Sequence, residues 1–515
     1  MAEYTSLQDT VYQPVAHQIS THGVAPDRPQ EQLGDNYLAS ASNFVLRNGR
    51  VERRGGFSTL VDTDVTSSGA RAFFEFTAVA GTAFLLAAGP FTIRYTTNGS
   101  SWTVISTGLA ATGEYPVMFT YFLTSSGGPR IIAVHGGINP LSWTTSTATS
   151  FTTLSTAIAS YALGAWRGHL LLGDTTVATG DGRVQARINW SALGNPATWS
   201  GTASAGFLDL MSINGTRVMC FQAMRTTLLV YKEEGVHALI YKASPFYFSQ
   251  VEMHPAISIY NPRCVAPIGL GDTHFVFTKD GAIIWDGQSI RPIGRDKVDR
   301  TILNSIQGDA IARMWAAWSP LDNEILFALT TTGGVNPDTL WIYNLTYDAW
   351  WETDVPALCF GISRHVLPPL TLLTGVGTTP GGTGAASGQV FQLFTGLSDG
   401  TATAAITASI QTGLYDYDQF NHKDVYKTHV AFGPGTGLTS TIQLSKAGQE
   451  NPVIASTFAS AQSLTSTGGP GLPFVDYRLT NRWIAYRVTH TAANELCQIS
   501  AILPELTPRT VRRKD

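Results

Sequence analysis

Short hydrophobic runs separated by turn residues recur along the chain, and residues 273–293 show this pattern most clearly. Three β-type runs in this stretch are divided by two turns, at Asp280-Gly281 and Asp286-Gly287. Asp-Gly favours hairpin turns because glycine adopts a positive φ without a steric penalty and aspartate tolerates it. Runs rich in Val, Ile, Phe and Trp suit half-buried strands. The stretch therefore predicts a small antiparallel meander, which needs similar neighbours to be stable.

Comparable hydrophobic strand cores recur at steps of roughly 40–60 residues, close to the length of one four-stranded propeller blade. The cores begin at Leu85, Ile131, Leu170, Leu228, Phe275 and Ile325, and Leu372 begins a seventh candidate. A turn-forming asparagine also stands four residues before a tryptophan at Asn98, Asn139 and Asn195, as expected if each tryptophan packs between blades. The predicted fold class is all-β, with a β-propeller in which six blades are favoured and seven are the alternative. Chance repetition in a chain rich in Asn, Gly, Thr and Trp is the competing explanation.

Changes in composition divide the chain into four parts. Residues 1–35 are polar and predict an extended arm that is ordered only against a partner, and residues 36–69 predict a β-hairpin segment around Asn48-Gly49. Residues 70–400 hold the propeller repeats, with one short helix expected at 297–306. Residues 401–515 predict a separate C-terminal β-domain, a sandwich with a basic tail. Its alternating strands are expected at 404–411, 424–431, 440–445 and 482–489.

The composition favours a protein whose surface is covered by other subunits. Only 14% of the residues are charged, against roughly 25% in ordinary soluble domains. A secreted β protein rich in Thr and Ser is the alternative, although the N-terminus predicts no signal peptide. The net charge of −4 provides no overall attraction to nucleic acid. The four cysteines lie far apart and form no CxxC pair, which favours buried free thiols over a zinc site.

No constellation of residues with catalytic or metal-binding spacing is evident in the sequence. Glu233 and Glu234 are adjacent, so on a strand their carboxylates would point to opposite faces. The aspartates at 280, 286, 296 and 299 lack the spacing of a calcium loop, and turn formation explains the first two. We therefore expect no catalytic residue, no metal, no cofactor and no enzymatic activity.

Four arginines, Arg47, Arg50, Arg53 and Arg54, lie within eight residues of the hairpin around Asn48-Gly49. Solvated strand edges are the simplest explanation of such a cluster. Contact with an acidic neighbour is the second explanation.

Three segments together resemble tail nozzle (tail hub) proteins of short-tailed bacteriophages, a family that includes the packaged DNA stabilisation proteins. They are the Asp-Gly, Ile-Trp-Asp-Gly, Ile-Arg-Pro-Ile-Gly and Lys-Val-Asp-Arg elements of 280–300, the hairpin Asn43–Phe57, and residues 166–196. These segments consist of turn and packing residues, and their order carries the resemblance. The hairpin departs from the family pattern at Gly55, where proline is usual, and a looser turn is expected there.

The resemblance implies a hexameric ring of this chain in the virion tail, assembled in the host cytoplasm. Propellers would face outward, and a β-sandwich or platform domain built from the N- and C-terminal segments would surround a DNA channel. The implied partners are further copies of the chain, the head-to-tail adaptor or portal-side protein, a tail fibre or tailspike, and a tail needle or tip. Double-stranded DNA would pass without sequence-specific binding, and the chain would not insert into a membrane.

A conduit should hold DNA weakly, because each Lys or Arg that neutralises a phosphate adds affinity. An acidic or neutral channel lining is therefore expected. Under this resemblance Arg47, Arg50, Arg53 and Arg54 become candidates for contact with the adaptor or a neighbouring subunit. A carbohydrate-binding or glycoside-hydrolase propeller is the alternative function.

Overall fold

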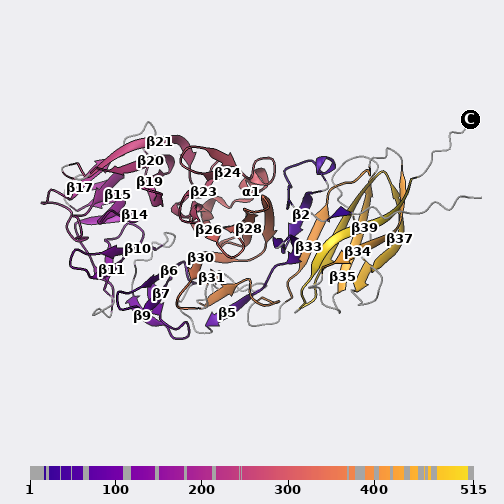
Figure 1. Ribbon diagram of the computed structural model, residues 1–515, viewed down its shortest axis with the longest axis horizontal. Helices are drawn as coiled ribbons and strands as arrows, with labels where there is room; N and C mark the ends of the chain where they lie inside the picture. Colours follow the sequence, from indigo (N-terminus) through magenta and orange to yellow (C-terminus); the bar gives the residue numbers. More distant parts are fainter. Residues whose placement is uncertain are drawn as a thin grey trace, which may run out of the picture.

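The computed structural model describes residues 17–508 apart from residues 19–21, 35, 48, 62–68, 108, 110–116, 145–149, 179–181, 211–215, 243, 245, 368–369, 377–388, 400–404, 418–421, 434–440, 450–457, 459–461, 466–472 and 494. The described residues form mainly β-structure. Most of the strands belong to a ring of sheets, and a second β-domain lies beside that ring (Figure 1).

Seven four-stranded antiparallel units surround a common centre among the described residues, so the main domain is a β-propeller (Figure 1). Blade 1 comprises β6 (Ala72–Thr77), β7 (Ala83–Ala88), β8 (Thr92–Thr96) and β9 (Thr103–Thr107). Blade 2 comprises β10 (Met118–Leu123), β11 (Pro129–Val134), β12 (Leu141–Trp143) and β13 (Thr152–Thr153). Blade 3 comprises β14 (Ile158–Trp166), β15 (His169–Val177), β16 (Gly182–Trp190) and β17 (Gly206–Asp209). Blade 4 comprises β18 (Val218–Met224), β19 (Thr227–Lys232), β20 (Glu234–Tyr241) and β21 (Phe248–Ser258).

The remaining blades complete the ring. Blade 5 comprises β22 (Val265–Ile268), β23 (Thr273–Thr278), β24 (Gly281–Trp285) and β25 (Ile290–Pro292). Blade 6 comprises β26 (Trp315–Ser319), β27 (Glu324–Leu329), β28 (Thr339–Asn344) and β29 (Ala349–Thr353). Blade 7 comprises β30 (Ala357–Ser363), β31 (Thr371–Val376), β32 (Val390–Leu393) and, from the N-terminal part of the chain, β5 (Phe57–Val61).

Each of the seven hydrophobic cores predicted from the sequence falls in the second strand of a blade, from β7 in blade 1 to β31 in blade 7. These strands have a neighbour on either side in the sheet and another blade against each face. Leu170, Leu171 and Leu172 of β15, for example, are all fully buried. A strand buried on both faces has an uninterrupted hydrophobic run, which is why these strands produce the repeat.

The propeller has seven blades, so the preference for six was wrong. Blade 7 is closed by β5, whose Thr59 and Phe57 lie opposite Phe391 and Leu393 of β32. The outer strand of this blade therefore comes from a segment more than 300 residues away, and no continuous repeat marks it in the sequence. The same pairing corrects the expected division at 36–69, because the hairpin part of that segment joins the second domain and β5 joins the propeller.

The predicted packing of tryptophans between blades is confirmed. Trp143 of blade 2 meets Phe76, Phe84 and Tyr95 of blade 1 edge-on or tilted, with ring centroids 5.3–6.0 Å apart. Trp199 is buried in a cluster that combines side chains of blades 2 and 3. Such aromatic contacts add to the burial energy and hold neighbouring sheets in a fixed orientation.

The second domain is built from two sheets and contains the predicted C-terminal strands. One sheet has the order β3 (Phe44–Arg47), β4 (Arg50–Arg53), β39 (Gln498–Pro508), β34 (Lys423–Phe432) and β37 (Phe474–Asn481), with β1 (His17–Gln18) on β39. The other contains β2 (Leu38–Ser42), β33 (Ala408–Thr412), β38 (Trp483–His490), β35 (Thr441–Gln449) and β36 (Gln462–Thr465). Val430 and Ile502 of the first sheet share a buried core with Tyr486 and Val488 of the second.

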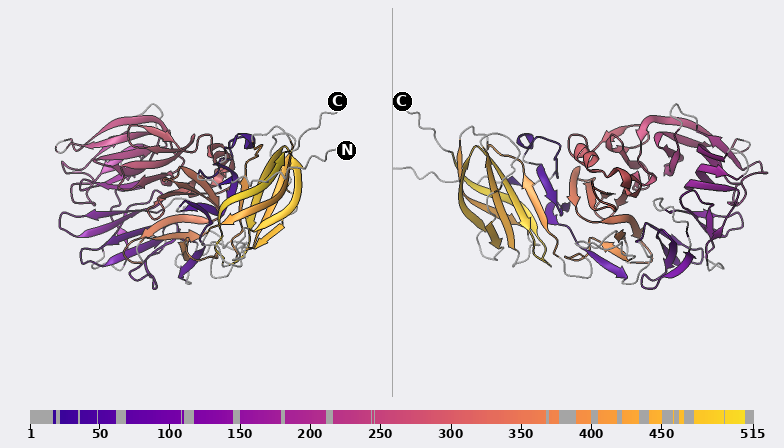
Figure 2. Two further views of the ribbon diagram at one scale, coloured as in Figure 1. Left: turned by 45° about the vertical axis from the view of Figure 1, so that its right-hand side comes forward. Right: turned by 180° about the vertical axis from the view of Figure 1, so that it is seen from behind.

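One sheet passes from the propeller into the second domain without interruption. Its nine strands run from β26 to β29 of blade 6, then through β2 to β36. The junction is a parallel pairing of Ser42 in β2 with Glu352 in β29. In two views the second domain flanks the rim of the propeller rather than covering its open face (Figures 1 and 2).

The N-terminal segment is ordered against its own chain, which corrects the expectation for the part of residues 1–35 that the structure describes. The Val24 backbone N–H donates to the Trp350 carbonyl over 2.8 Å. Asp27 accepts hydrogen bonds from the backbone N–H groups of Arg300 and Thr301, at the start of helix α1 (Asp299–Ser305). The first sixteen residues lie outside the described part of the chain.

Helix α1 confirms the short helix predicted at 297–306. The other helical turns of the described chain are the 3₁₀ segments η1 (Gln30–Gln32), η2 (Pro262–Cys264) and η3 (Gly308–Arg313). None of the helices in the described part of the chain has the length and hydrophobicity needed to cross a bilayer.

Candidate functional site

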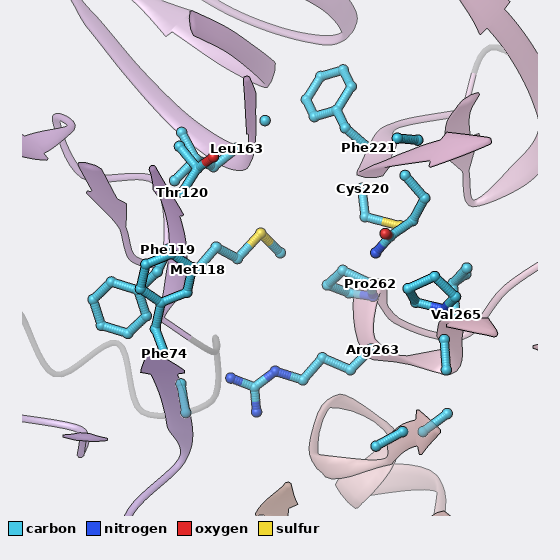
Figure 3. Close-up of a pocket in the computed structure, with 18 of the residues that line it drawn as sticks. Phe74, Met118, Phe119, Thr120, Leu163, Cys220, Phe221, Pro262, Arg263 and Val265 are labelled. Carbon is cyan, nitrogen blue, oxygen red and sulfur yellow. The ribbon is translucent and has the colours of Figure 1, made fainter. Parts of the chain in front are cut away.

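A cavity of about 600 Å³ lies at the centre of the propeller, within the size range of small-molecule sites. Its walls come from the first strands of all seven blades, β6, β10, β14, β18, β22, β26 and β30, and from η2. The lining includes the apolar residues Phe74, Met118, Phe119, Leu163 and Phe221 and also exposes polar atoms (Figure 3). The cavity therefore exists only because the ring of blades closes.

Arg263 extends from η2 into this cavity (Figure 3). The 3₁₀ turn is fixed by Asn261, whose side-chain oxygen accepts a hydrogen bond from the Arg263 backbone N–H over 2.7 Å. The Asn261 amide also donates to the carbonyls of Ile311 and Met314, before β26. Pro262 suits the first position of this turn because its φ is already restricted. The turn thus presents Arg263 from a rigid support.

The guanidinium of Arg263 stacks on an aromatic ring and keeps one nitrogen unpaired. Its central carbon lies 3.5 Å from the ring centroid of Trp315. Its Nη2 atom is buried and has no hydrogen-bond partner among the described residues. Burial lowers the pKa of Arg263; the Cys359 thiol opposes this shift, and the positive charge of Arg71 adds to it. A buried cation without a counterion is costly unless a ligand neutralises it.

Sequence reasoning did not single out Arg263. An isolated arginine between two strands has no spacing that marks a site, and its position in a cavity depends on how seven distant segments assemble. The signal that the sequence does contain is Asn261-Pro262, a capping residue followed by a helix-starting proline immediately before the arginine.

The arginine cluster of the hairpin lies at the joint between the two domains. Arg54 is only 1% exposed and forms two hydrogen bonds to Asp399, of 2.7 and 2.8 Å, and one to Asp354 of 2.8 Å. Its Nε atom donates to Asn43 over 2.8 Å. Burial disfavours the charged form, but the bonds and charges of Asp399 and Asp354 outweigh this effect and raise the pKa of Arg54. The acidic neighbour anticipated for the cluster thus belongs to the same chain.

The other three arginines differ in exposure. Arg53 is 1% exposed and donates to the carbonyls of Leu397 and Ala492. Arg47 is paired with Asp322 and Glu324 of blade 6 at 3.3 and 3.4 Å. The expected contact with the adaptor or a neighbouring subunit is therefore wrong for Arg53 and Arg54. Arg47 is already paired within the chain, whereas Arg50 is exposed.

The Arg47 pair places a carboxylate in an unusual environment. Glu324 is 1% exposed, and burial raises its pKa to about 7 although Arg47 opposes this shift. The Asn344 amide donates to the same carboxylate over 3.4 Å. The charge state of this joint therefore changes near neutral pH.

Gly55 and Gly56 follow the arginines and are required by close backbone approach. A Cβ atom on Gly55 would lie 2.6 Å from the Phe394 carbonyl oxygen, and one on Gly56 would lie 1.8 Å from that of Ser398. The looser turn expected from glycine in place of proline at Gly55 is thus a tightly packed one.

The acidic residues considered in the sequence take structural roles. Glu233 and Glu234 are part-exposed and both lie within 4.0 Å of the Lys279 ammonium group. The Asp286 carboxylate accepts hydrogen bonds from the backbone N–H groups of Gln288 and Ser289, and these bonds lower its pKa to about 2. No group of three or more His, Cys, Asp or Glu side chains suited to a metal ion occurs in the described part of the chain.

All four cysteines, Cys220, Cys264, Cys359 and Cys497, are buried free thiols. Burial raises the pKa of Cys264, Cys359 and Cys497 to about 12. A protonated buried thiol is a poor nucleophile. These cysteines therefore contribute to packing.

No family model matches the sequence, and no curated protein matches it either. Several solved structures are similar to the chain at low identity. Virginiamycin B lyase from Staphylococcus aureus is 10% identical over 65% of this chain and 96% of its own, with a TM-score of 0.35. The Pan2 WD40 domain of Neurospora crassa is 9% identical over 65% of this chain and 97% of its own, with a TM-score of 0.36. An exo-beta-1,3-galactanase from Phanerochaete chrysosporium is 9% identical over 96% of this chain and 100% of its own, with a TM-score of 0.22. At these scores the similarities say nothing about activity or ligands.

Proposed function

We propose that the chain is a structural virion protein, one subunit of a hexameric tail nozzle or hub that retains and releases DNA below a head-to-tail adaptor. The proposal starts from the resemblance of residues 43–57, 166–196 and 280–300 to proteins of that kind. Its partners would be further copies of the chain, the adaptor, a tail fibre or tailspike, and a tail needle or tip. Double-stranded DNA would pass through the ring without base-specific contacts.

The observation that carries the proposal is the joint between the two domains, which is held by strand pairing and buried hydrogen bonds. The nine-stranded sheet connects them by backbone pairing, and the buried Arg54 ties the hairpin to Asp399 and Asp354. A flexible linker would let a propeller move independently of its platform. A subunit that withstands the force of packaged DNA needs a propeller that is fixed to its platform. Here the platform is the second domain, which contains both N- and C-terminal segments.

The exposed apolar side chains support an assembly as well. Phe207 in β17, and Val251 and Met253 in β21, are 40–56% exposed on the outermost strands of two neighbouring blades. Exposed strand edges and apolar side chains are common sites of association. In the proposed assembly this rim faces outward and is available to a fibre or tailspike.

The test is the mass of the full-length chain in solution, alone and with the adaptor protein supplied. We expect a species of six-fold the mass of one chain when the adaptor is present. The alternative function, a carbohydrate-binding or glycoside-hydrolase propeller, predicts a monomer that binds or cleaves glycans. A monomer under both conditions, together with glycan turnover, would contradict the nozzle function.

A further inference from the structure

The central cavity combines aromatic side chains with positive charge. Arg263 and Arg364 are the charged side chains among its described lining residues, and no carboxylate is among them. The polar side chains Thr120 and Gln222 lie in the same lining. A ligand that complements this surface carries a negatively charged group and an apolar part.

Arg263 is held in position without being neutralised. Its backbone is fixed by Asn261 and its guanidinium rests on Trp315, so its direction is set before any ligand binds. Its Nη2 atom remains buried and unpartnered within the described part of the chain. This differs from Arg54, whose guanidinium is satisfied by Asp399 and Asp354. An arginine that is rigid and stacked but lacks a counterion is arranged to receive an oxyanion.

We propose that the propeller cavity binds a small organic anion, whose carboxylate or phosphate group pairs with Arg263 and whose apolar body packs against Phe74 and Phe119. Both side chains lie on the side of the cavity toward which the arginine extends (Figure 3). The volume of about 600 Å³ accommodates a ligand much larger than an inorganic ion. This site is independent of ring assembly and of the nozzle function.

The first experiment titrates the full-length wild-type chain by calorimetry at low salt with benzoate, phenyl phosphate, inorganic phosphate and benzyl alcohol. We expect binding of benzoate or phenyl phosphate, and the stronger of the two identifies the oxyanion. Benzyl alcohol, which keeps the ring but lacks the charge, and inorganic phosphate, which keeps the charge but lacks the ring, should each bind about ten-fold more weakly or not at all. Failure of both aryl anions to bind would overturn the assignment.

The second experiment compares Arg263→Met with Arg225→Met. Arg225 is a matched control because its side chain is 65% exposed and pairs with Asp272 outside the cavity. We expect Arg263→Met to weaken aryl-anion binding by about ten-fold or more, and Arg225→Met to leave it unchanged. Arg263→Lys, which keeps the charge but loses the planar fork, should fall between them.

The ligand-free variant provides a separate readout. Because Arg263 carries an unpaired buried charge, the Arg263→Met chain without ligand should unfold at the same or a higher temperature than wild type. If Arg263 served only to stabilise the fold, Arg263→Met would unfold at a lower temperature than wild type. A lower unfolding temperature with unchanged anion binding would contradict the site.

Discussion

At the scale of single residues, buried charges with opposite roles explain the arrangement of the chain. Arg54 is neutralised by carboxylates from distant segments and connects the hairpin of the second domain to the segments that follow blades 6 and 7. Arg263 lacks such a partner among the described residues and faces a cavity. Glu324 is buried beside Arg47 at the same domain joint as Arg54. Each of these charges can be tested separately by substitution.

Replacing Arg54 with methionine should destabilise the protein strongly, because the 8% exposed Asp399 carboxylate loses its counterion. We expect the free energy of unfolding in urea to fall by about 3–5 kcal/mol. Arg50→Met is the control, since Arg50 is exposed on the same hairpin and should change stability by less than about 0.5 kcal/mol. Adding Asp399→Asn to Arg54→Met should restore part of the loss. A loss of stability in Arg54→Met no larger than that in Arg50→Met would contradict the role of Arg54.

Glu324 predicts a specific dependence of stability on pH. Its pKa is about 7 in the folded chain and ordinarily 4.5, so between these values the folded state binds more protons than the unfolded state. The stability that Glu324 contributes is therefore present below pH 4.5 and is lost as the pH rises to about 7. Glu324→Gln stays neutral, so its stability relative to wild type should rise by about 1–3 kcal/mol over this window. Urea unfolding of both proteins at several pH values measures this difference in the free energy of unfolding. A difference that does not vary with pH would contradict the raised pKa of the buried carboxylate.

At the scale of elements, β5 closes the ring and should control the stability of blade 7. Phe57 is 1% exposed and packs edge-on against Phe391 of β32, with ring centroids 5.5 Å apart. β32 pairs in turn with β31, and β31 pairs with β30. Loss of the closing strand should therefore loosen blade 7 before the blades that are continuous in sequence.

Phe57→Ala should lower the free energy of unfolding by about 3–5 kcal/mol. It should also speed amide hydrogen exchange in β32 more than in β15 or β19. The matched control is Phe91→Ala, because Phe91 is 41% exposed in the turn between β7 and β8. Mass-spectrometric exchange on both variants and wild type makes the comparison. Uniform acceleration over all blades would show that β5 does not act as a local closure.

The second strands of the blades could be predicted from the sequence, and β5 could not. Leu170 to Leu172 form an uninterrupted apolar run because blades cover both faces of β15, and this burial is visible in a single segment. The pairing of Phe57 with Leu393 joins segments more than 300 residues apart, and neither has a signal for the other. Arg54 was identifiable as part of a cluster, but its burial depends on Asp399, again far away in the chain. Arg263 became a candidate only once seven blades defined a cavity around it.

At the scale of the whole molecule, two domains form one body with a ligand-sized cavity in one of them. The nine-stranded sheet and the Arg54 contacts join the platform to blades 6 and 7, while the cavity lies on the axis of the propeller. The rim of blades 3 and 4 exposes apolar side chains away from this joint. In the proposed nozzle, platforms meet around the DNA channel, and the propellers project outward.

Electron microscopy of the full-length chain with the adaptor tests that assembly most directly. We predict closed rings of six subunits in class averages, with the second domains surrounding a central opening and the propellers at the periphery. Isolated two-domain particles at every protein concentration, with or without the adaptor, would contradict it.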